Sequence, residues 1–374
     1  MKRSLYLLIL PILALVVSCV HQFPDDATPA QLDVALEFDS EIAYFRAIKF
    51  PEETAPKLDF EEAPETKPVY FEYIQPDWKT EAHLHKVRYV VQAHRVLSED
   101  RIATNYAVRE VFYDDDPTSW DRFEFDLMLQ EGVYEVRVWA DYIGRDSNDN
   151  LYYDPTDFSG ITLNLADGHH GNTDFRDAYS GKARVKVVRY GAIDEPTHIV
   201  VPMSHPMGKY VFVTDDLEEF AEKVVRNKGG RPELFAGSPT KSPDFNIEDY
   251  ELTIRCSQYM PTSYSMVTDR ANDSKVNVQF KSSLKAIDDN YAIMGFDYVL
   301  ANPLYATNPV TKIVLDIILK DKDGNVLATH ERLYVPVKRG KMTLVEGSFL
   351  MQESDGGVSI DPGFDGPDII VPVN

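Results

Sequence analysis

Residues 1–19 have the pattern of an export signal, which determines the compartment in which the rest of this chain must fold. Two basic residues at positions 2 and 3 precede an apolar run from Leu5 to Val17, and Ser18 stands directly before Cys19. A basic start, a short apolar run and a small residue before the cut are typical of a secretory signal. The run is too short to cross a bilayer core of ~30 Å comfortably, so we do not expect a structural helix here.

The end of this signal, Val16-Val17-Ser18-Cys19, resembles a bacterial lipobox. Such a signal is cut before the cysteine, which then receives lipid on its thiol and its new amine. We therefore predict a signal peptide over residues 1–18, lipidation of Cys19 and a tether over residues 19–30, with the protein held at the outer membrane. Asp25 and Asp26 resemble the acidic signal that sends lipoproteins of Bacteroidetes to the cell surface. The alternative is an ordinary signal peptide with an incidental cysteine.

Lipidation would leave Cys256 without a disulfide partner, because the chain has 2 cysteines. The fold must then rest on its apolar core, and 44% hydrophobic residues are enough to build one. Cys256 shares a predicted strand face with Leu252 and Ile254, so we expect a small buried side chain rather than a reactive thiol. A formal charge of -23 argues against nucleic acid as a partner, since phosphate requires Lys and Arg.

Apolar and polar residues alternate along many short segments, which is typical of half-buried strands. The sequence around 215–225 instead has helical spacing, with Thr214 or Asp215 as the expected cap. Many strands and few helices indicate antiparallel β-sandwiches, and the length suggests two domains. We place them at residues 31–205 and 206–374. The predicted strands cover residues 32–38, 87–93, 122–129, 134–142, 161–165, 183–189, 198–201, 209–214, 250–256, 276–280, 291–299, 313–319, 327–337 and 343–350.

Several sequence landmarks together resemble a known family. They are the Val-Trp-Ala-Asp-Tyr run at 138–142, the segments at 171–179, 209–220 and 259–263, the Val-Pro-Val-Lys-Arg run at 335–339, and the Gly-rich segment at 356–366. In this order they resemble the fimbrillin-like surface lipoproteins of Bacteroidetes, relatives of the major and minor subunits of type V pili. The resemblance implies two tandem transthyretin-like antiparallel β-sandwich domains, with one short helix opening the second domain.

The resemblance also implies a mode of assembly. In fimbrillins, a protease associated with the outer membrane cuts after an Arg or Lys that follows the first strand, and a strand of another subunit fills the groove left behind. Arg46 and Lys49, in the expected loop after the first strand, are the candidate cut sites here. A permanent first strand and a self-paired last strand are the alternatives. The candidate exchange residues are Leu32, Val34, Leu36 and Phe38 in the removable strand, and Ile369, Val371 and Val373 in the donor strand.

We therefore expect a structural or adhesive subunit of a fimbria or pilus, or its membrane anchor, and not an enzyme. Its partners would be other fimbrial subunits by strand complementation, the outer membrane through the N-terminal lipid, and host or bacterial surface ligands. The alternative is a monomeric surface glycan-binding lipoprotein that uses Trp120 or Trp139 as a sugar platform. Trp139 lies mid-strand, however, which favours a place in the core.

No motif for catalysis, a cofactor or a metal stands out in the sequence. Residues 146–154 carry oxygen ligands at alternating positions, as calcium loops do, but lack the Gly and the Glu of such a loop. We expect solvated turns there and at Asp114-Asp115-Asp116. The pairs His83/His85 and His169/His170 have no further ligand at a spacing that suits zinc.

Overall fold

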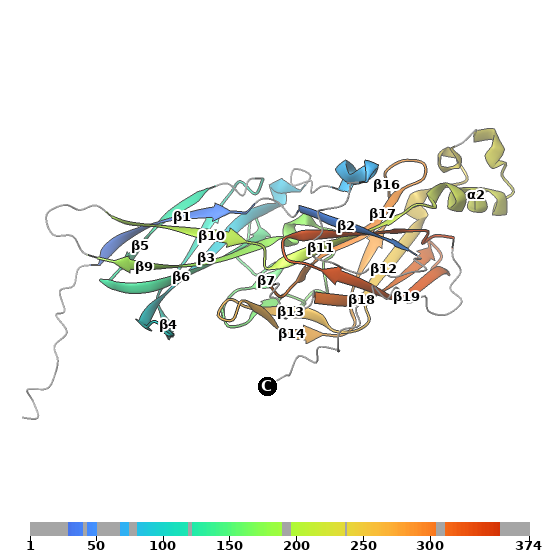
Figure 1. Ribbon diagram of the computed structural model, residues 1–374. Coiled ribbons are helices and arrows are strands. Elements are labelled where there is room, and N and C mark those ends of the chain that lie inside the picture. The colour runs from blue at the N-terminus through green and yellow to red at the C-terminus, as the bar shows by residue number, and fades with distance from the viewer. Residues whose placement is uncertain are drawn as a thin grey trace, which may run out of the picture.

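The computed structural model describes residues 29–39, 43–50, 68–74, 81–118, 122–188, 196–235, 238–303 and 311–351 (Figure 1). Strands dominate it, and α2 (Leu217–Asn227) is the α-helix among the described residues. The mostly-β expectation is confirmed. The strands are β1 (Ala30–Phe38), β2 (Ala43–Phe50), β3 (His85–Ser98), β4 (Arg101–Asp114), β5 (Phe123–Leu129), β6 (Gly132–Gly144), β7 (Tyr153–Asp154), β8 (Ile161–Leu163), β9 (Ala178–Val187), β10 (Thr197–Ser204), β11 (Met207–Thr214), β12 (Tyr250–Cys256), β13 (Met260–Ser265), β14 (Arg270–Lys275), β15 (Val278–Ser283), β16 (Lys285–Ala286), β17 (Ala292–Leu300), β18 (Thr311–Asp321), β19 (Val326–Val337) and β20 (Lys341–Gly347).

Short 3-10 helices fill several connections between the strands. In the described residues, no helix is long and apolar enough to span a membrane. The 3-10 helices are η1 (Val69–Ile74), η2 (Ala82–Leu84), η3 (Asp174–Arg176), η4 (Pro232–Phe235), η5 (Pro239–Lys241) and η6 (Ile247–Asp249).

The first half of the chain forms a sandwich from one seven-stranded sheet with the order β4-β3-β6-β9-β10-β1-β5. β9 and β10 pair at only two positions of the described ladder, Met203↔Gly181 and Ser204↔Ser180. The sheet folds back on itself at these pairs, and we call this place the turn-over. The layer β10-β1-β5 then faces the layer β4-β3-β6-β9, as ring contacts across the core show. Tyr89 of β3 stacks on Phe123 of β5 at 4.0 Å between ring centroids.

Gly181 allows the close approach of β9 and β10 at this turn-over. A Cβ atom at position 181 would lie 2.4 Å from the carbonyl oxygen of Pro202 and 2.5 Å from the sulfur of Met203. Both distances are far shorter than a carbon atom tolerates. The position therefore requires a residue without a side chain.

The second half is a sandwich of two separate sheets, β16-β17-β11-β20-β2 and β15-β12-β18-β19. The two sheets pack tightly, since the Ser282 hydroxyl of β15 donates to the Met294 carbonyl of β17 at 2.5 Å. A smaller sheet, β14-β13-β8-β7, joins the halves through the pairs Ser263↔Thr162 and Tyr264↔Ile161. The buried apolar residues of both halves form one continuous core.

Most ladders are antiparallel, as expected, but three of the described ladders are parallel: β1 with β10, β11 with β20, and β2 with β20. Parallel pairs need a long connection, and in each case many residues separate the two strands. The chain passes from the first large sheet to the second between Ser204 and Met207. β2 crosses that division, because it comes early in the chain and pairs in the second half.

The helix expected after residue 214 is present as α2, and its buried face includes Leu217 and Phe220. The expected cap was wrong: the N-cap residue is Asp216, not Thr214 or Asp215. Asp216 makes no side-chain bond to the helix. Its carboxylate instead accepts hydrogen bonds from the backbone N–H groups of Leu350 at 3.0 Å and Met351 at 2.8 Å. It therefore holds the last described residues against the start of the helix.

Candidate functional site

β1 is the middle strand of the three-stranded layer in the first half. It pairs in parallel with β10, from Leu32↔Thr197 to Phe38↔Met203. On its other side it pairs antiparallel with β5, from Ala30↔Leu129 to Leu36↔Phe123. Its backbone is thus bonded on both sides. Without β1, β5 and β10 would each present an unpaired edge to the same gap.

The side chains that β1 turns inward are part of the core. Leu32 and Leu36 have no exposed surface, and Val34 is 2% exposed. Phe38 is half-buried and its ring meets Tyr179 edge-on at 5.0 Å. Burying three such aliphatic side chains stabilises the fold by about 1.5–3 kcal/mol each. The gap left by β1 would therefore be an apolar groove with alternating pockets.

Arg46 and Lys49 lie in β2 rather than in the loop that we expected after the first strand. β2 runs parallel to β20, with Arg46 opposite Thr343 and Lys49 opposite Glu346. It lies at one edge of its sheet. The loop expectation was wrong because residues 43–50 are rich in aromatic residues, which favour strands despite the two basic residues among them.

Several other predicted site residues lie outside the described residues. These are the lipidation site Cys19, the candidate donor residues Ile369, Val371 and Val373, and the candidate platform residue Trp120. Trp139 is fully buried in β6, so it belongs to the core and offers no sugar platform. Cys256 is buried too, and burial raises the pKa of its thiol to about 11. This fits the expected structural role.

The candidate metal ligands are engaged with protein groups. In the 146–154 loop, the Asp149 carboxylate accepts from the Ser147 hydroxyl at 2.7 Å, and Asn150 accepts from Arg88 at 2.7 Å. His83 and His85 do not share a strand, because His83 lies in η2. Within the described ranges, no group of three or more His, Cys, Asp or Glu residues is arranged to hold a metal ion.

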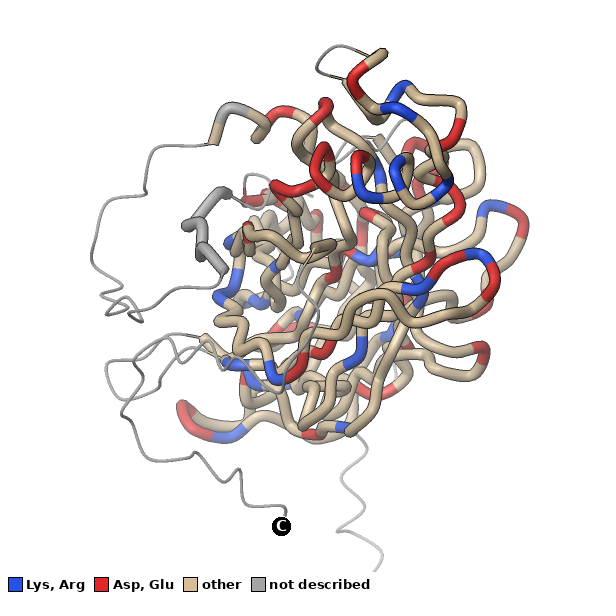
Figure 2. The backbone as a smooth tube through the Cα atoms, turned by 90° about the vertical axis from the view of Figure 1, so that its right-hand side faces the viewer, with Lys and Arg blue, Asp and Glu red and all other residues tan. Residues whose placement is uncertain are grey.

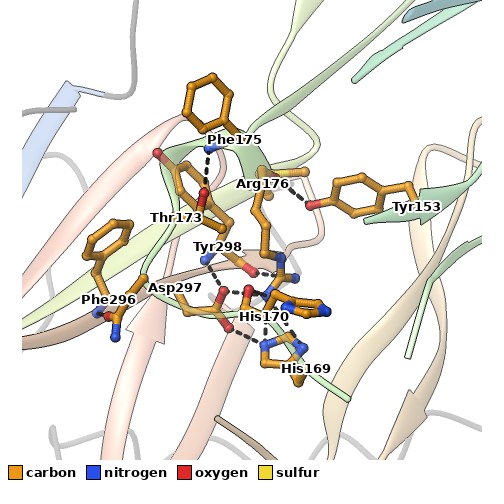
Figure 3. A network of polar contacts seen from close by, with 11 residues as sticks. Tyr153, His169, His170, Thr173, Phe175, Arg176, Phe296, Asp297 and Tyr298 are labelled. Atoms are coloured by element: carbon orange, nitrogen blue, oxygen red, sulfur yellow. Dashed lines mark hydrogen bonds and ion pairs between the residues drawn. The ribbon is translucent and has the colours of Figure 1, made fainter. Parts of the chain in front are cut away.

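A buried polar network connects the two halves (Figure 3). Arg176 of η3 reaches Asp297 of β17, with 2.5 Å between guanidinium and carboxylate, and both side chains are almost fully buried. His169 donates to the other carboxylate oxygen of Asp297 at 2.7 Å. Burial raises the pKa of Asp297, but the attraction of Arg176 and His169 outweighs burial and holds that pKa below its ordinary value. Burial, together with Arg176, lowers the pKa of His169.

Further ion pairs extend this junction along η3. Lys209 of β11 donates to Asp174 at 2.6 Å, and the Tyr298 hydroxyl donates to the same carboxylate oxygen at 2.9 Å. Asp177 contacts the ring of His205 at 2.8 Å. Asp174 and Arg176 thus bond to the second half of the chain, and Asp177 bonds to the connection between the halves. The junction fixes how the two sandwiches are placed.

Lys209 and Asp297 were missed by sequence reasoning, although each leaves a signal. Lys209 is the one charged residue in β11, where every residue is buried. Asp297 likewise interrupts an apolar strand. A charge inside an apolar strand must have a buried partner, because an unpaired charge is very costly to bury. The sequence does not say which partner, since Asp174 and Arg176 are distant in the chain.

Figure 2 marks the positions of the charged residues along the backbone. Lys and Arg residues are interspersed with Asp and Glu residues along the backbone in Figure 2. The formal charge of -23 argues against phosphate-rich partners.

Comparison with known proteins places the chain in a family. A family model described as a family of unknown function (DUF6562) matches residues 53–372. The chain belongs to this family. The DUF6562 match begins after β2, so β1 and β2 precede it. No curated protein matches the chain.

Two solved structures are similar to this DUF6562 chain in fold. The first is the fimbrial anchor protein Mfa2 from Porphyromonas gingivalis, at 11% identity over 80% of this chain and 82% of that one, with a TM-score of 0.34. The second is the tip fimbrial protein Mfa3 from the same organism, with a C-terminal truncation, at 11% identity over 82% and 81%, with a TM-score of 0.35.

Proposed function

We propose that this protein is a non-catalytic subunit of a surface fimbria, exported as a lipoprotein and joined to its neighbours by exchange of the first strand. The observation that carries the proposal is the place of β1 between β5 and β10. A strand in that place can be replaced by any strand that makes the same two ladders. The sequence landmarks of a fimbrillin-like lipoprotein support the same role.

The groove of β1 sets what a replacement strand must offer. It needs apolar side chains at alternate positions to fill the places of Leu32, Val34 and Leu36. Ile369, Val371 and Val373 have this spacing in the sequence. Pro372 lies between the last two and lacks a backbone N–H, so a strand containing it would lose one hydrogen bond to β5 or β10. An empty groove would be an exposed pairing edge, so exchange must be rapid or assisted.

Cleavage at Arg46 or Lys49 requires β2 to leave its sheet first, because a protease binds its substrate as an unpaired extended segment. Among the described strands β2 pairs with β20 alone, so its release breaks one described ladder. Edge elements of this kind open more readily than central ones. A cut after Arg46 would free β1 together with the first part of β2.

The test is mass spectrometry of the native protein shed from the cell surface, with gel analysis of its assembly state. Polymerisation predicts an N-terminus at Ala47 or Phe50 in high-mass ladders that resist detergent. The double variant Arg46→Gln/Lys49→Gln should lose both the new N-terminus and the ladders. The matched control is Arg122→Gln, an exposed basic residue, which should keep both.

Intact lipidated Cys19 found on monomers alone would defeat the polymerising-subunit proposal. The protein would then be an uncut anchor at the base of a fimbria or a monomeric glycan-binding lipoprotein. The anchor would still bind a fimbrial subunit in pull-down from the same cells, whereas the monomeric glycan binder would not.

A further inference from the structure

A cavity of about 250 Å³ lies on the outer side of the second sandwich, beside the junction of the two halves. Its floor is formed by β11 and β17, and η1 and the residues just before and within η3 form its walls. The polar and aromatic groups around it come from distant parts of the chain. They are Tyr73, Glu81, Asp174, Lys209, Lys285 and Phe296.

The floor of this cavity carries a buried ion pair. Lys209 is 1% exposed, and its ammonium donates to Asp174 at 2.6 Å. An ammonium group has three N–H donors, and the described residues supply Lys209 with one hydrogen-bond acceptor. Lys209 also lies over the ring of Phe296, at 4.2 Å from its centroid. A charge held this way is fixed in place and can donate to oxygen atoms of a ligand in the cavity.

The wall next to this floor is rigid before any ligand arrives. Asn172 adopts a left-handed backbone conformation with φ 57°. Its side chain accepts from the Phe296 backbone N–H at 2.8 Å and donates to the Ser282 hydroxyl at 2.6 Å. A Cβ atom at Gly171 would lie 2.4 Å from the ring of Phe280, so this turn fits closely against the second half. A preformed wall reduces the ordering cost of binding.

The mouth of the cavity is aromatic. Tyr73 in η1 is 63% exposed, and Phe296 is half-buried on the facing strand. An exposed tyrosine beside a polar cavity offers a flat apolar face to the C–H groups of a ligand.

The charges that line the cavity balance one another. Lys209 and Lys285 are opposed by Asp174 and Glu81, so a ligand with a strong charge of either sign gains little. A carboxylate beside an ammonium can bind two adjacent hydroxyl groups of a ligand, because the carboxylate accepts a hydrogen bond and the ammonium donates one. The volume is below the usual ~300–1,000 Å³ of small-molecule pockets, which favours a single ring.

From these features, we infer that the cavity between η1, η3 and β17 binds one neutral hexose unit, as the end of a glycan. The site shares no residue with the β1 groove, and it goes beyond the proposed function. Binding at the cavity and strand exchange can therefore succeed or fail separately. A larger hollow of about 550 Å³ beside α2 has no such buried ammonium, because its Lys241, which pairs with Asp289, is 73% exposed.

The test is saturation-transfer NMR and calorimetry of the full chain with methyl glycosides of glucose, galactose and mannose. Glucuronate and glucosamine serve as the charged comparisons. At least one neutral glycoside should bind more tightly than both charged sugars. Tyr73→Ala should weaken that binding about tenfold, and Tyr73→Phe should keep it within about twofold. Tyr259→Ala is the matched control, since Tyr259 is a 71% exposed tyrosine away from the cavity.

Asp174→Asn should abolish binding, and its thermal unfolding shows whether the fold survives. If that variant does not fold, the three tyrosine variants decide alone, because Tyr73 and Tyr259 are exposed and neither is part of the core. Absence of binding by all three neutral glycosides would overturn the inference. So would tighter binding of glucuronate, or equal losses in Tyr73→Ala and Tyr259→Ala.

Discussion

Replacing Asp297 by Asn tests whether the buried junction holds the two sandwiches together. The carboxylate of Asp297 receives Arg176 at 2.5 Å and His169 at 2.7 Å, and both it and Arg176 are at most 3% exposed. Asn keeps the shape of the side chain but leaves the guanidinium buried without a counter-charge. Breaking a buried pair in this way costs about 3–5 kcal/mol, a large part of the ~5–15 kcal/mol that stabilises a typical domain.

The assay is thermal and denaturant unfolding of Asp297→Asn beside the parent chain. At about 2–4 °C per kcal/mol, the melting temperature should fall by roughly 6–20 °C. The control is Glu251→Gln, which breaks the exposed pair with Lys281 and should cost at most about 1 kcal/mol. A loss in Asp297→Asn no larger than in the control would refute the reasoning that the junction is a buried, paired charge.

The same substitution should change how stability depends on pH. The folded pKa of Asp297 lies below the ~3.9 of an unfolded Asp, because Arg176 and His169 outweigh burial. Its contribution is therefore fully present above pH ~4 and is lost as the pH falls through the folded pKa. Asp297→Asn should lack that part of the acid dependence, as unfolding titrations between neutral and acid pH will show. An unchanged acid dependence would contradict the assignment.

Three further predictions concern the core and the turn-over of the first sheet. Leu36→Ala should lower the free energy of unfolding by about 2–5 kcal/mol, because Leu36 is fully buried. Glu37→Ala, on the exposed side of β1, should change it by no more than ~0.5 kcal/mol. Equal effects of the two substitutions would show that β1 is not part of the core. Gly181→Ala should lower the free energy of unfolding by about 1–3 kcal/mol, because the new Cβ atom would clash with the Pro202 carbonyl oxygen. An unchanged free energy of unfolding would mean that β9 and β10 separate easily. In a chain beginning at residue 20, Cys256 should not react with a thiol reagent at pH 8 until denaturant is added, because it is buried and the pKa of its thiol is raised to about 11. Fast labelling of the folded chain would contradict both the burial and the raised pKa.

The strands of the sandwiches could be predicted from the sequence because burial on one face leaves a period of two. β1 shows this pattern, with Leu32, Val34 and Leu36 inward and the more exposed Asp33 and Glu37 facing the other way. β2 could not be predicted in the same way. Its partner β20 is almost 300 residues later in the chain, and a parallel edge ladder leaves no turn signal in the sequence.

The sequence predicted one strand of the candidate site, β1, but not the strands on either side of it. The apolar spacing of β1 indicates which side chains fill the groove, but not that β5 and β10 flank it. Those neighbours depend on the order of strands in the sheet, which local patterns do not determine. The junction shows the same limit. Lys209 and Asp297 stand out as charges in apolar strands, yet their partners are fixed by the tertiary fold.

The fold separates the element that the proposed cleavage removes from the elements that join its two halves. β1 pairs in the first sandwich and β2 in the second, so the removable segment touches both. The halves are nevertheless joined without it, through the β8–β13 ladder and the Arg176–Asp297 pair. A cut after Arg46 would therefore open the groove beside β5 and β10 while the sandwiches stay fixed. A rigid acceptor of this kind favours strand exchange, because the incoming strand orders only itself.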